Sequence, residues 1–224
     1  MATELKALEH PVANNSDYLR SSPATVWVKQ HAKSWSAGDF TIAADRDGLS
    51  KSAKDGELLF SVQSKWASWS QKRDFTDASG NPLFQLYRES KGRTWFAEMA
   101  GPMRALPFAK LKPLPCALKD KVDVHVLNQA KEGGEVVLQV RGQDVWKRNT
   151  MVYLNDSVVM TVRRTDYLSV YVPWKRPEWE VKVATGLDLS LAATITVLLA
   201  TIAYDSSMTA SAIAAGAGAG GGAG

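Results

Sequence analysis

Short segments that alternate between apolar and polar residues make up most of the chain and predict β-strands. They follow one another closely, six between residues 24 and 101 and six between residues 121 and 184, and each ends at turn-forming residues. An apolar residue at every second position places these side chains on one face of a strand. Because short strands at this density are typical of antiparallel all-β folds, the pattern predicts a barrel or a sandwich of about twelve strands.

The segment from Leu187 to Tyr204 differs, because it is a single long apolar run. No charged residue occurs between positions 189 and 203. On an ideal helix, its principal apolar face carries Leu187, Leu191, Ile195, Leu198 and Ile202. A thin stripe of hydroxyl residues needs no water, because each hydroxyl can bond to a carbonyl one turn earlier. This stripe consists of Ser190, Thr194 and Thr201. Every face of the predicted helix therefore requires burial.

Two interpretations compete for this apolar run, a membrane span and a helix inside a protein core. A span requires about 20 predominantly apolar residues, whereas the uncharged run here has 16 residues and is flanked by Asp188 and Asp205. Asp188 and Thr185, on either side of Gly186, have the character of a helix start, where a carboxylate accepts backbone N–H groups. We therefore predict a core helix, with a tail anchor as the alternative.

The length of the helix indicates how the strands enclose it. A barrel of eight strands is filled by its own side chains, whereas a wider barrel leaves a lumen. A helix of about 17 residues is about 25 Å long, and strands of about 7 residues span about 23 Å. The pattern therefore predicts a mainly β fold, a closed antiparallel β-barrel of about twelve strands around a central C-terminal hydrophobic helix over residues 187–204.

The domain boundaries follow from composition. Residues 1–23 are polar without a sustained period, which predicts a flexible N-terminal lead, and residues 208–224 are an Ala/Gly-rich segment that we expect to be disordered. The folded domain is then 24–205. Four prolines punctuate residues 101–121 and predict a crossing connection without a central strand. They are Pro102, Pro107, Pro113 and Pro115.

The two halves of the domain, about 24–101 and 121–184, resemble each other. A shift of 75 positions places Lys72-Arg73 on Lys147-Arg148 and Arg88 on Arg163, with a turn at a corresponding place in each half. This predicts a pseudo-repeat. Chance similarity is the alternative, because alternating apolar segments align easily.

Composition and motifs exclude several kinds of chemistry. The single cysteine, Cys116, rules out an internal disulfide framework, and the three histidines are far apart without metal-ligand spacing. Asp45 begins a stretch that could suggest a calcium loop, but Ser50 and Gly56 occupy the positions where an EF-hand needs Gly and Glu, so it predicts a turn. The chain also lacks a nucleophile elbow and a phosphate-binding glycine loop. We predict no metal, no cofactor, no catalytic residue and no enzyme activity.

Basic residues are the remaining candidates for binding. The net charge of +4 is too small to indicate nucleic acid by itself. Four basic doublets occur, however, and a cluster of them beside a bilayer would gain about 1 kcal/mol per residue from anionic lipid. The doublets are Lys72-Arg73, Lys147-Arg148, Arg163-Arg164 and Lys175-Arg176, accompanied by Lys110, Lys112, Lys119 and Lys121 and by Trp66, Trp69, Trp174 and Trp179. The alternative is that the doublets are solvated strand ends balanced by acids and that the tryptophans line the core.

Several stretches resemble the LURP-one-related family with its Tubby C-terminal-like domain. They are DFTIAADRDGLSKSAKDGELLFSVQSK, KRDFTDASGNPLFQLYRE, RTWFAEMAG and EWEVKVATGLDLSLAATITVLLATIAYD. The resemblance spans about residues 24–205 and includes the step Gly186-Leu187-Asp188 before the terminal helix. It implies a twelve-stranded barrel similar to those of Tubby proteins, which bind phosphoinositides, and of phospholipid scramblases, and it implies a link to plant defence. No functional residue of those proteins has a matching position here.

These observations lead to one preferred function and two alternatives. We expect a monomeric, non-catalytic Tubby-like binding domain that engages phosphoinositide or other anionic lipid in stress or defence signalling, with Lys72, Arg73, Lys147, Arg148, Arg163 and Arg164 as candidate lipid-binding residues. The alternatives are a protein-interaction scaffold and scramblase-like lipid transport. The absence of a secretory signal predicts a cytoplasmic location, peripheral at membranes, with the nucleus as a further option.

Overall fold

The computed structural model of the chain describes residues 4–31, 38–65, 70–100, 107–114, 120–130, 134–144, 148–166 and 177–218, with only the backbone from residue 204 onward. A short 3-10 turn, Ser16–Tyr18, precedes twelve strands and one helix, α1 (Leu189–Gly218). The strands are β1 (Ala24–Gln30), β2 (Phe40–Ala44), β3 (Glu57–Ser64), β4 (Arg73–Asp77), β5 (Pro82–Arg88), β6 (Trp95–Met99), β7 (Ala109–Pro113), β8 (Lys121–Asn128), β9 (Gly134–Gly142), β10 (Asn149–Leu154), β11 (Ser157–Arg164) and β12 (Glu178–Val183).

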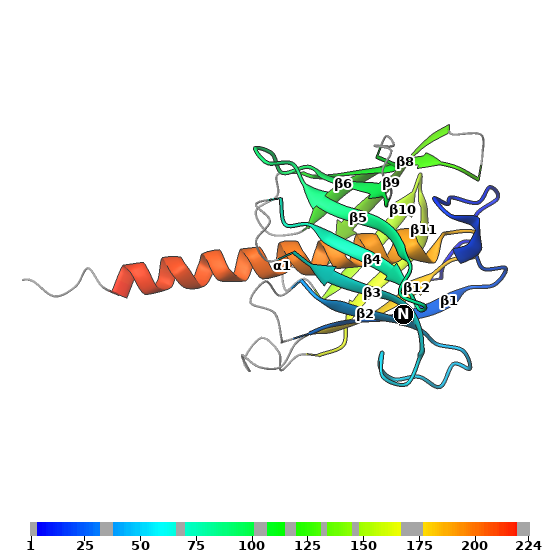
Figure 1. Cartoon of the computed structure of the whole chain (residues 1–224), viewed down its shortest axis with the longest axis horizontal. Helices are drawn as coiled ribbons and strands as arrows, with labels where there is room; N and C mark the ends of the chain where they lie inside the picture. Colours follow the sequence, from blue (N-terminus) through cyan, green and yellow to red (C-terminus); the bar gives the residue numbers. More distant parts are fainter. Residues whose placement is uncertain are drawn as a thin grey trace, which may run out of the picture.

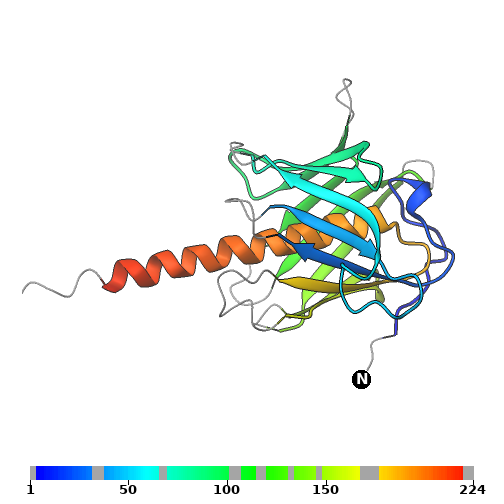
Figure 2. The same cartoon turned by 60° about the horizontal axis from the view of Figure 1, so that its bottom comes forward.

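The strands form one closed barrel in which sequential neighbours pair and β1 closes the ring against β12. Every pairing is antiparallel, and register shifts occur in β2–β3, β4–β5 and β10–β11. Helix α1 enters the barrel at one end, runs along its interior and emerges at the other end (Figures 1 and 2). The predicted twelve-stranded barrel with a central helix is confirmed.

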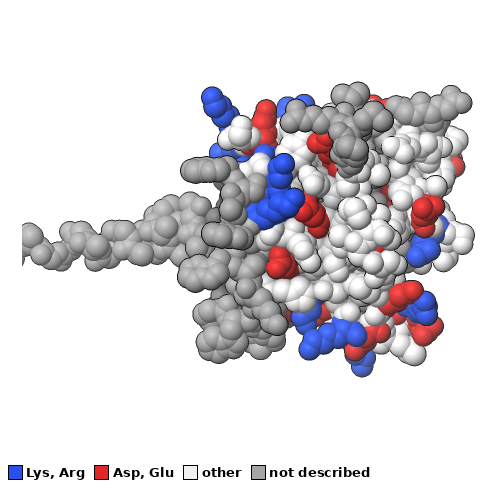
Figure 3. All heavy atoms as spheres, viewed as in Figure 1, with Lys and Arg blue, Asp and Glu red and all other residues white. Residues whose placement is uncertain are grey.

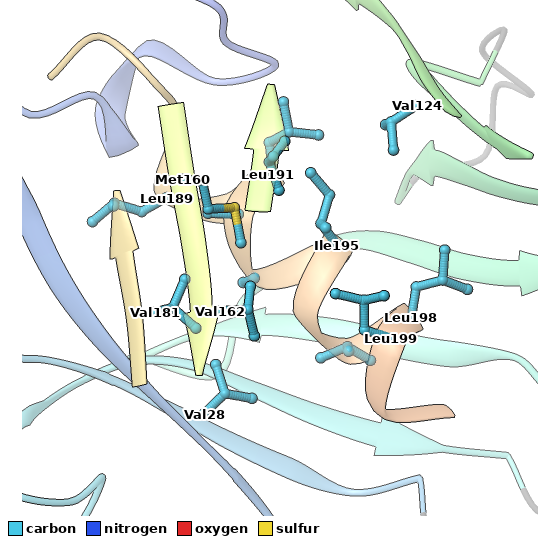
Figure 4. Close-up of a cluster of buried hydrophobic side chains, with 14 of the residues drawn as sticks. Val28, Val124, Met160, Val162, Val181, Leu189, Leu191, Ile195, Leu198 and Leu199 are labelled. Carbon is cyan, nitrogen blue, oxygen red and sulfur yellow. The ribbon is translucent and has the colours of Figure 1, made fainter. Parts of the chain in front are cut away.

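The alternation of the sequence places apolar side chains inside the barrel, where they meet the helix. From Leu187 to Thr201 no side chain is more than 6% exposed. Leu191, Ile195 and Leu198 project toward surrounding strands, among them the strand that carries Met160 and Val162 (Figure 4). Because contacts on all sides replace water, the helix needs no polar face. Ile202 is half-buried and packs against the edge of this core.

The prediction for the hydroxyl stripe holds for two of its three residues, whereas the buried hydroxyl of Ser190 has no hydrogen-bond partner among the described residues. Thr194 donates to the Ser190 carbonyl at 2.8 Å, and Thr201 donates to the Val197 carbonyl at 2.8 Å. Thr196, which was not part of the predicted stripe, makes the same bond to Ala192 at 2.9 Å. Among the described residues, no helix combines the length and the apolar character needed to cross a bilayer.

The prediction that residues 101–121 lack a strand is wrong. β7 lies within this connection and pairs with β6 on one side and β8 on the other. Pro107 precedes the strand and Pro113 is its last residue, so neither proline interrupts the ladder. The predicted strand over YLSVYVPW lies outside the described residues, and β11 instead pairs directly with β12.

The two ends of the chain's folded part also differ from expectation. The predicted loose lead contains an ordered segment, in which Val12, Ala13 and Asn14 are buried. The helix begins at Leu189, two residues after the predicted start at residue 187, and its backbone continues to Gly218, through part of the segment for which we predicted disorder. The pseudo-repeat remains a prediction: the shift of 75 places the β4–β5 hairpin on the β10–β11 hairpin, each with a register shift.

Candidate functional site

The basic doublets meet at one end of the barrel because the strands alternate in direction. We call this the exit end, where α1 emerges, and the opposite end, where α1 begins, the entrance end (Figure 1). β4 and β10 start at the exit end and β11 finishes there. Lys72-Arg73, Arg148 and Arg163-Arg164 are therefore all exit-end residues. Lys147, Lys175 and Arg176 lie outside the described residues.

Arg73 does not face solvent. Arg73 is two residues before Phe75 on β4, so both side chains point into the barrel, and Arg73 is only 4% exposed. Its guanidinium lies over the ring of Trp95, with Cζ 5.3 Å from the ring centroid. Its Nη1 also donates to the Gln71 carbonyl at 2.9 Å. The guanidinium is thus held inside the mouth of the barrel, where it stabilises the fold and offers no surface to a membrane.

The Arg163-Arg164 doublet is divided between the outside and the interior in a similar way. Arg163 points outward and its guanidinium binds the Glu180 carboxylate, with Nε 2.8 Å from Oε2. Arg164 is half-buried, and burial lowers the pKa of its guanidinium; Asp166 opposes this effect and the nearby Arg148 adds to it. Arg148 is exposed. The described residues of the doublets therefore share one end of the barrel without forming one exposed basic face among themselves.

The other predicted basic and aromatic residues also separate. Lys110 and Lys112 are exposed on β7, and Lys121 is exposed at the start of β8. Trp179 is 6% exposed and belongs to the core, as the alternative interpretation predicted. Lys119, Trp66, Trp69 and Trp174 lie outside the described residues.

A hollow of about 460 Å³ at the exit end brings two of the cations together. Figure 3 shows Lys and Arg side chains grouped near this end of the barrel on the face seen in Figure 1, with Asp and Glu beside them. We call this hollow the basic–aromatic hollow. Its main lining residues are Ser70, Lys72, Tyr87, Arg88, Phe96 and Pro107. Glu89 and Ser90 complete its wall at the turn after β5.

The floor of this hollow is an aromatic pair on the outside of the barrel. Tyr87 and Phe96 are cross-strand partners, with ring centroids 5.8 Å apart and planes at 33°. The Lys72 ammonium lies 5.9 Å from the Tyr87 ring centroid, and Lys110 is the partner of Phe96 on its other side. Rings half-exposed beside ammonium groups give the surface both apolar and cationic character.

Among the described residues, no acid forms an ion pair with the cations of the hollow, Lys72 and Arg88. Glu89 is the one acid on the wall, and its carboxylate packs against Gly92 of its own turn, where an added Cβ would collide with it. Across the residues that the structure describes, no group of His, Cys, Asp and Glu could hold a metal ion.

Lys72 was predicted from the sequence as a site residue, whereas Arg88, Tyr87 and Phe96 were not. Arg88 entered only as part of the repeat alignment, because it is not part of a doublet. The period of two does place Tyr87 and Phe96 opposite the buried Leu86 and Trp95. Two aromatic residues on the outward rows of neighbouring strands were therefore a usable signal, but only once the pairing of β5 with β6 was known.

Comparisons with known proteins agree with this architecture. The model of the LURP-one-related family matches residues 24–200. The X-ray structure of a protein from Arabidopsis thaliana is similar with a TM-score of 0.58 and 18% sequence identity, covering 86% of this chain and 98% of that one. No curated protein sequence matches the chain. Since the family match spans the whole barrel and the first part of α1, the chain belongs to the LURP-one-related family.

Proposed function

We propose that this chain is a non-catalytic binding protein whose basic–aromatic hollow engages the headgroup of an anionic lipid, such as a phosphoinositide, at the cytoplasmic surface of a membrane. One observation carries the proposal. Lys72 and Arg88 line a hollow beside the half-exposed Tyr87–Phe96 pair and have no acidic partner in the described part of the chain. Family membership supports the further proposal that this binding serves stress or defence signalling.

Two physical effects support this function. A cation close to an anionic leaflet gains about 1 kcal/mol, so Lys72 and Arg88 together would contribute about 2 kcal/mol. The aromatic rings would add apolar contact at the headgroup level, where amphipathic side chains are favoured. Lys110, next to Phe96 on the outer face, would strengthen the attraction without entering the hollow.

The lining residues also favour binding over catalysis. Those that the structure describes supply cations, aromatic rings, hydroxyl groups and one carboxylate, and none of them is a histidine or a cysteine. Such a set can hold a phosphate by charge and hydrogen bonds.

Sedimentation with liposomes tests the proposal. Neutral phosphatidylcholine vesicles are compared with vesicles that also contain phosphatidylserine or a phosphoinositide, at low and at physiological salt. We expect the chain to sediment only with the anionic vesicles and less strongly as salt rises, because salt screens the attraction. Equal binding to neutral and anionic vesicles at both salt concentrations would contradict the proposed function.

A further inference from the structure

We propose that the entrance end of the barrel is a peptide-binding groove, which the chain's own residues 5–15 occupy, and that this groove accepts an extended peptide of the same chemistry supplied in trans. This site lies at the opposite end from the basic–aromatic hollow and does not depend on its function. In Figures 1 and 2 the N-terminal segment crosses the end of the barrel at which α1 begins.

Backbone groups of the segment pair with the barrel as a bound peptide would. Val12 N–H donates to the Gly186 carbonyl at 2.8 Å, and Asp188 N–H donates to the Val12 carbonyl at 3.1 Å, which gives a parallel bridge between Val12 and Leu187. Nearer the N-terminus, Leu8 N–H donates to the Thr185 carbonyl at 3.0 Å. Main-chain pairing of this kind gives affinity with little dependence on side chains.

Two buried side chains, Asn128 on β8 and Asp188 just before α1, form hydrogen bonds with the next part of the segment. Asn128 accepts from Ala13 N–H at 3.0 Å and donates its amide to the Pro11 carbonyl at 2.8 Å. The Asp188 carboxylate accepts from two successive backbone N–H groups, those of Asn14 and Asn15, each at 3.0 Å. Asn128 is 1% exposed and Asp188 is 0% exposed, so both polar groups depend on the segment for these partners.

The groove thereby defines its ligand class. Val12 and Ala13 are 2% and 1% exposed, so these two positions take a medium apolar and a small residue. The following two positions must offer free backbone N–H groups, which excludes proline at either one. By contrast, Glu9 and His10 are exposed, so the groove places little demand on those side chains.

The connection to the barrel shows that the segment can be separated. Arg20, Ser21, Ser22 and Pro23 are all exposed between the segment and β1. A cut in this connection leaves every bond described above in place. The segment would then be held only by noncovalent contacts, like any bound peptide.

The test uses the full chain with a protease site inserted between Ser21 and Ser22 and cleaved after folding. A fluorescent synthetic peptide of residues 4–19 is then added, and its binding is followed by anisotropy. We expect saturable exchange into the groove and competition by the same unlabelled peptide. A peptide methylated on the Asn15 backbone nitrogen should bind at least about tenfold more weakly, because it removes a charge-assisted bond to Asp188.

A matched peptide with Glu9→Gln controls for nonspecific effects and should bind with unchanged affinity. Circular dichroism on the cleaved chain shows whether the barrel stays folded while its segment exchanges. Three results would overturn the inference: no entry of the peptide, equal binding of the Asn15-methylated peptide, or unfolding of the barrel as its own segment leaves. The last result would mean that the segment is part of the core and not a ligand.

Discussion

The backbone N–H of Asn15 donates to Oδ2 of Asp188 at 3.0 Å, although 173 positions separate these residues in the chain. The same carboxylate accepts from Ser190 N–H at 2.6 Å, two residues into the start of α1. One side chain therefore begins the central helix and holds the N-terminal segment over it. The sequence predicts the first role, because Asp188 follows Gly186, whose φ of +88° suits glycine.

Replacing Asp188 with Ala should lower the free energy of unfolding by about 3 kcal/mol or more. Loss of a helix N-cap costs about 1 kcal/mol, and each buried N–H left without an acceptor costs about 1–3 kcal/mol. Urea titration followed by tryptophan fluorescence measures this change. A loss below about 1 kcal/mol would mean that water replaces the carboxylate at all three N–H groups.

The stability contributed by Asp188 should also depend on pH. Burial raises the pKa of this carboxyl above its ordinary value of 3.8, and the hydrogen bonds from Ser190, Asn15 and Asn14 oppose the rise only in part. A raised folded-state pKa favours the protonated form in the fold, so this stability is complete below about pH 3.8 and is lost as pH rises through the folded value.

The matched control for this pH effect is Asp188→Asn, which cannot titrate. The free energy of unfolding of the native chain should fall relative to that of this variant as pH increases above 3.8. Parallel urea titrations at several pH values give the difference directly. A difference that moves the other way would show that the three hydrogen bonds outweigh burial and favour the ionised form.

Helix α1 can be tested by introducing a charge at its most enclosed positions. Ile195→Asp or Leu198→Asp should prevent folding, because burial of an unpaired carboxylate costs more than the typical stability of a domain can offset. The control Val137→Asp, at a site 37% exposed on β9, should remain folded. Soluble expression and circular dichroism distinguish these outcomes, and a folded Ile195→Asp chain would contradict the enclosed helix.

Substitutions at the two residues of the first basic doublet should affect different properties, stability at Arg73 and lipid binding at Lys72. Arg73→Met removes the guanidinium over Trp95 and should lower the free energy of unfolding by about 2 kcal/mol, the value of a desolvated cation–π contact. It should leave lipid binding unchanged. Lys72→Gln should weaken lipid binding and leave the free energy of unfolding nearly unchanged. If Arg73→Met weakened vesicle binding while the chain stayed folded, the assignment of Arg73 to the interior would be wrong.

The extent to which the sequence anticipates this molecule depends on how each feature is encoded. Burial on every face marks α1, and a period of two marks most strands, so the barrel was predictable. β7 was missed because Pro107 and Pro113 lie at its ends, where they do no harm. The N-terminal segment is held mainly through backbone groups, which leave no residue pattern to recognise.

The candidate site was less predictable for a different reason. Arg73 and Lys72 are neighbours in sequence, yet the strand sends one inward and leaves the other on the wall of the hollow. Arg163 is paired with Glu180, a residue on another strand, so its charge is not free to bind lipid. Such cross-strand partners are fixed by register, which the alternation of a single strand cannot reveal.

The most direct test of the proposed function compares two charge-matched variants in the liposome assay. Lys72→Gln with Arg88→Gln removes two cations from the hollow, whereas Lys51→Gln with Lys54→Gln removes two exposed cations from the entrance end. We expect the first pair to weaken partitioning onto anionic vesicles by roughly 30-fold, from about 1 kcal/mol per residue, and the second pair to bind like the native chain. Equal loss in both variants, or no loss in the first, would contradict the assignment of lipid binding to the hollow.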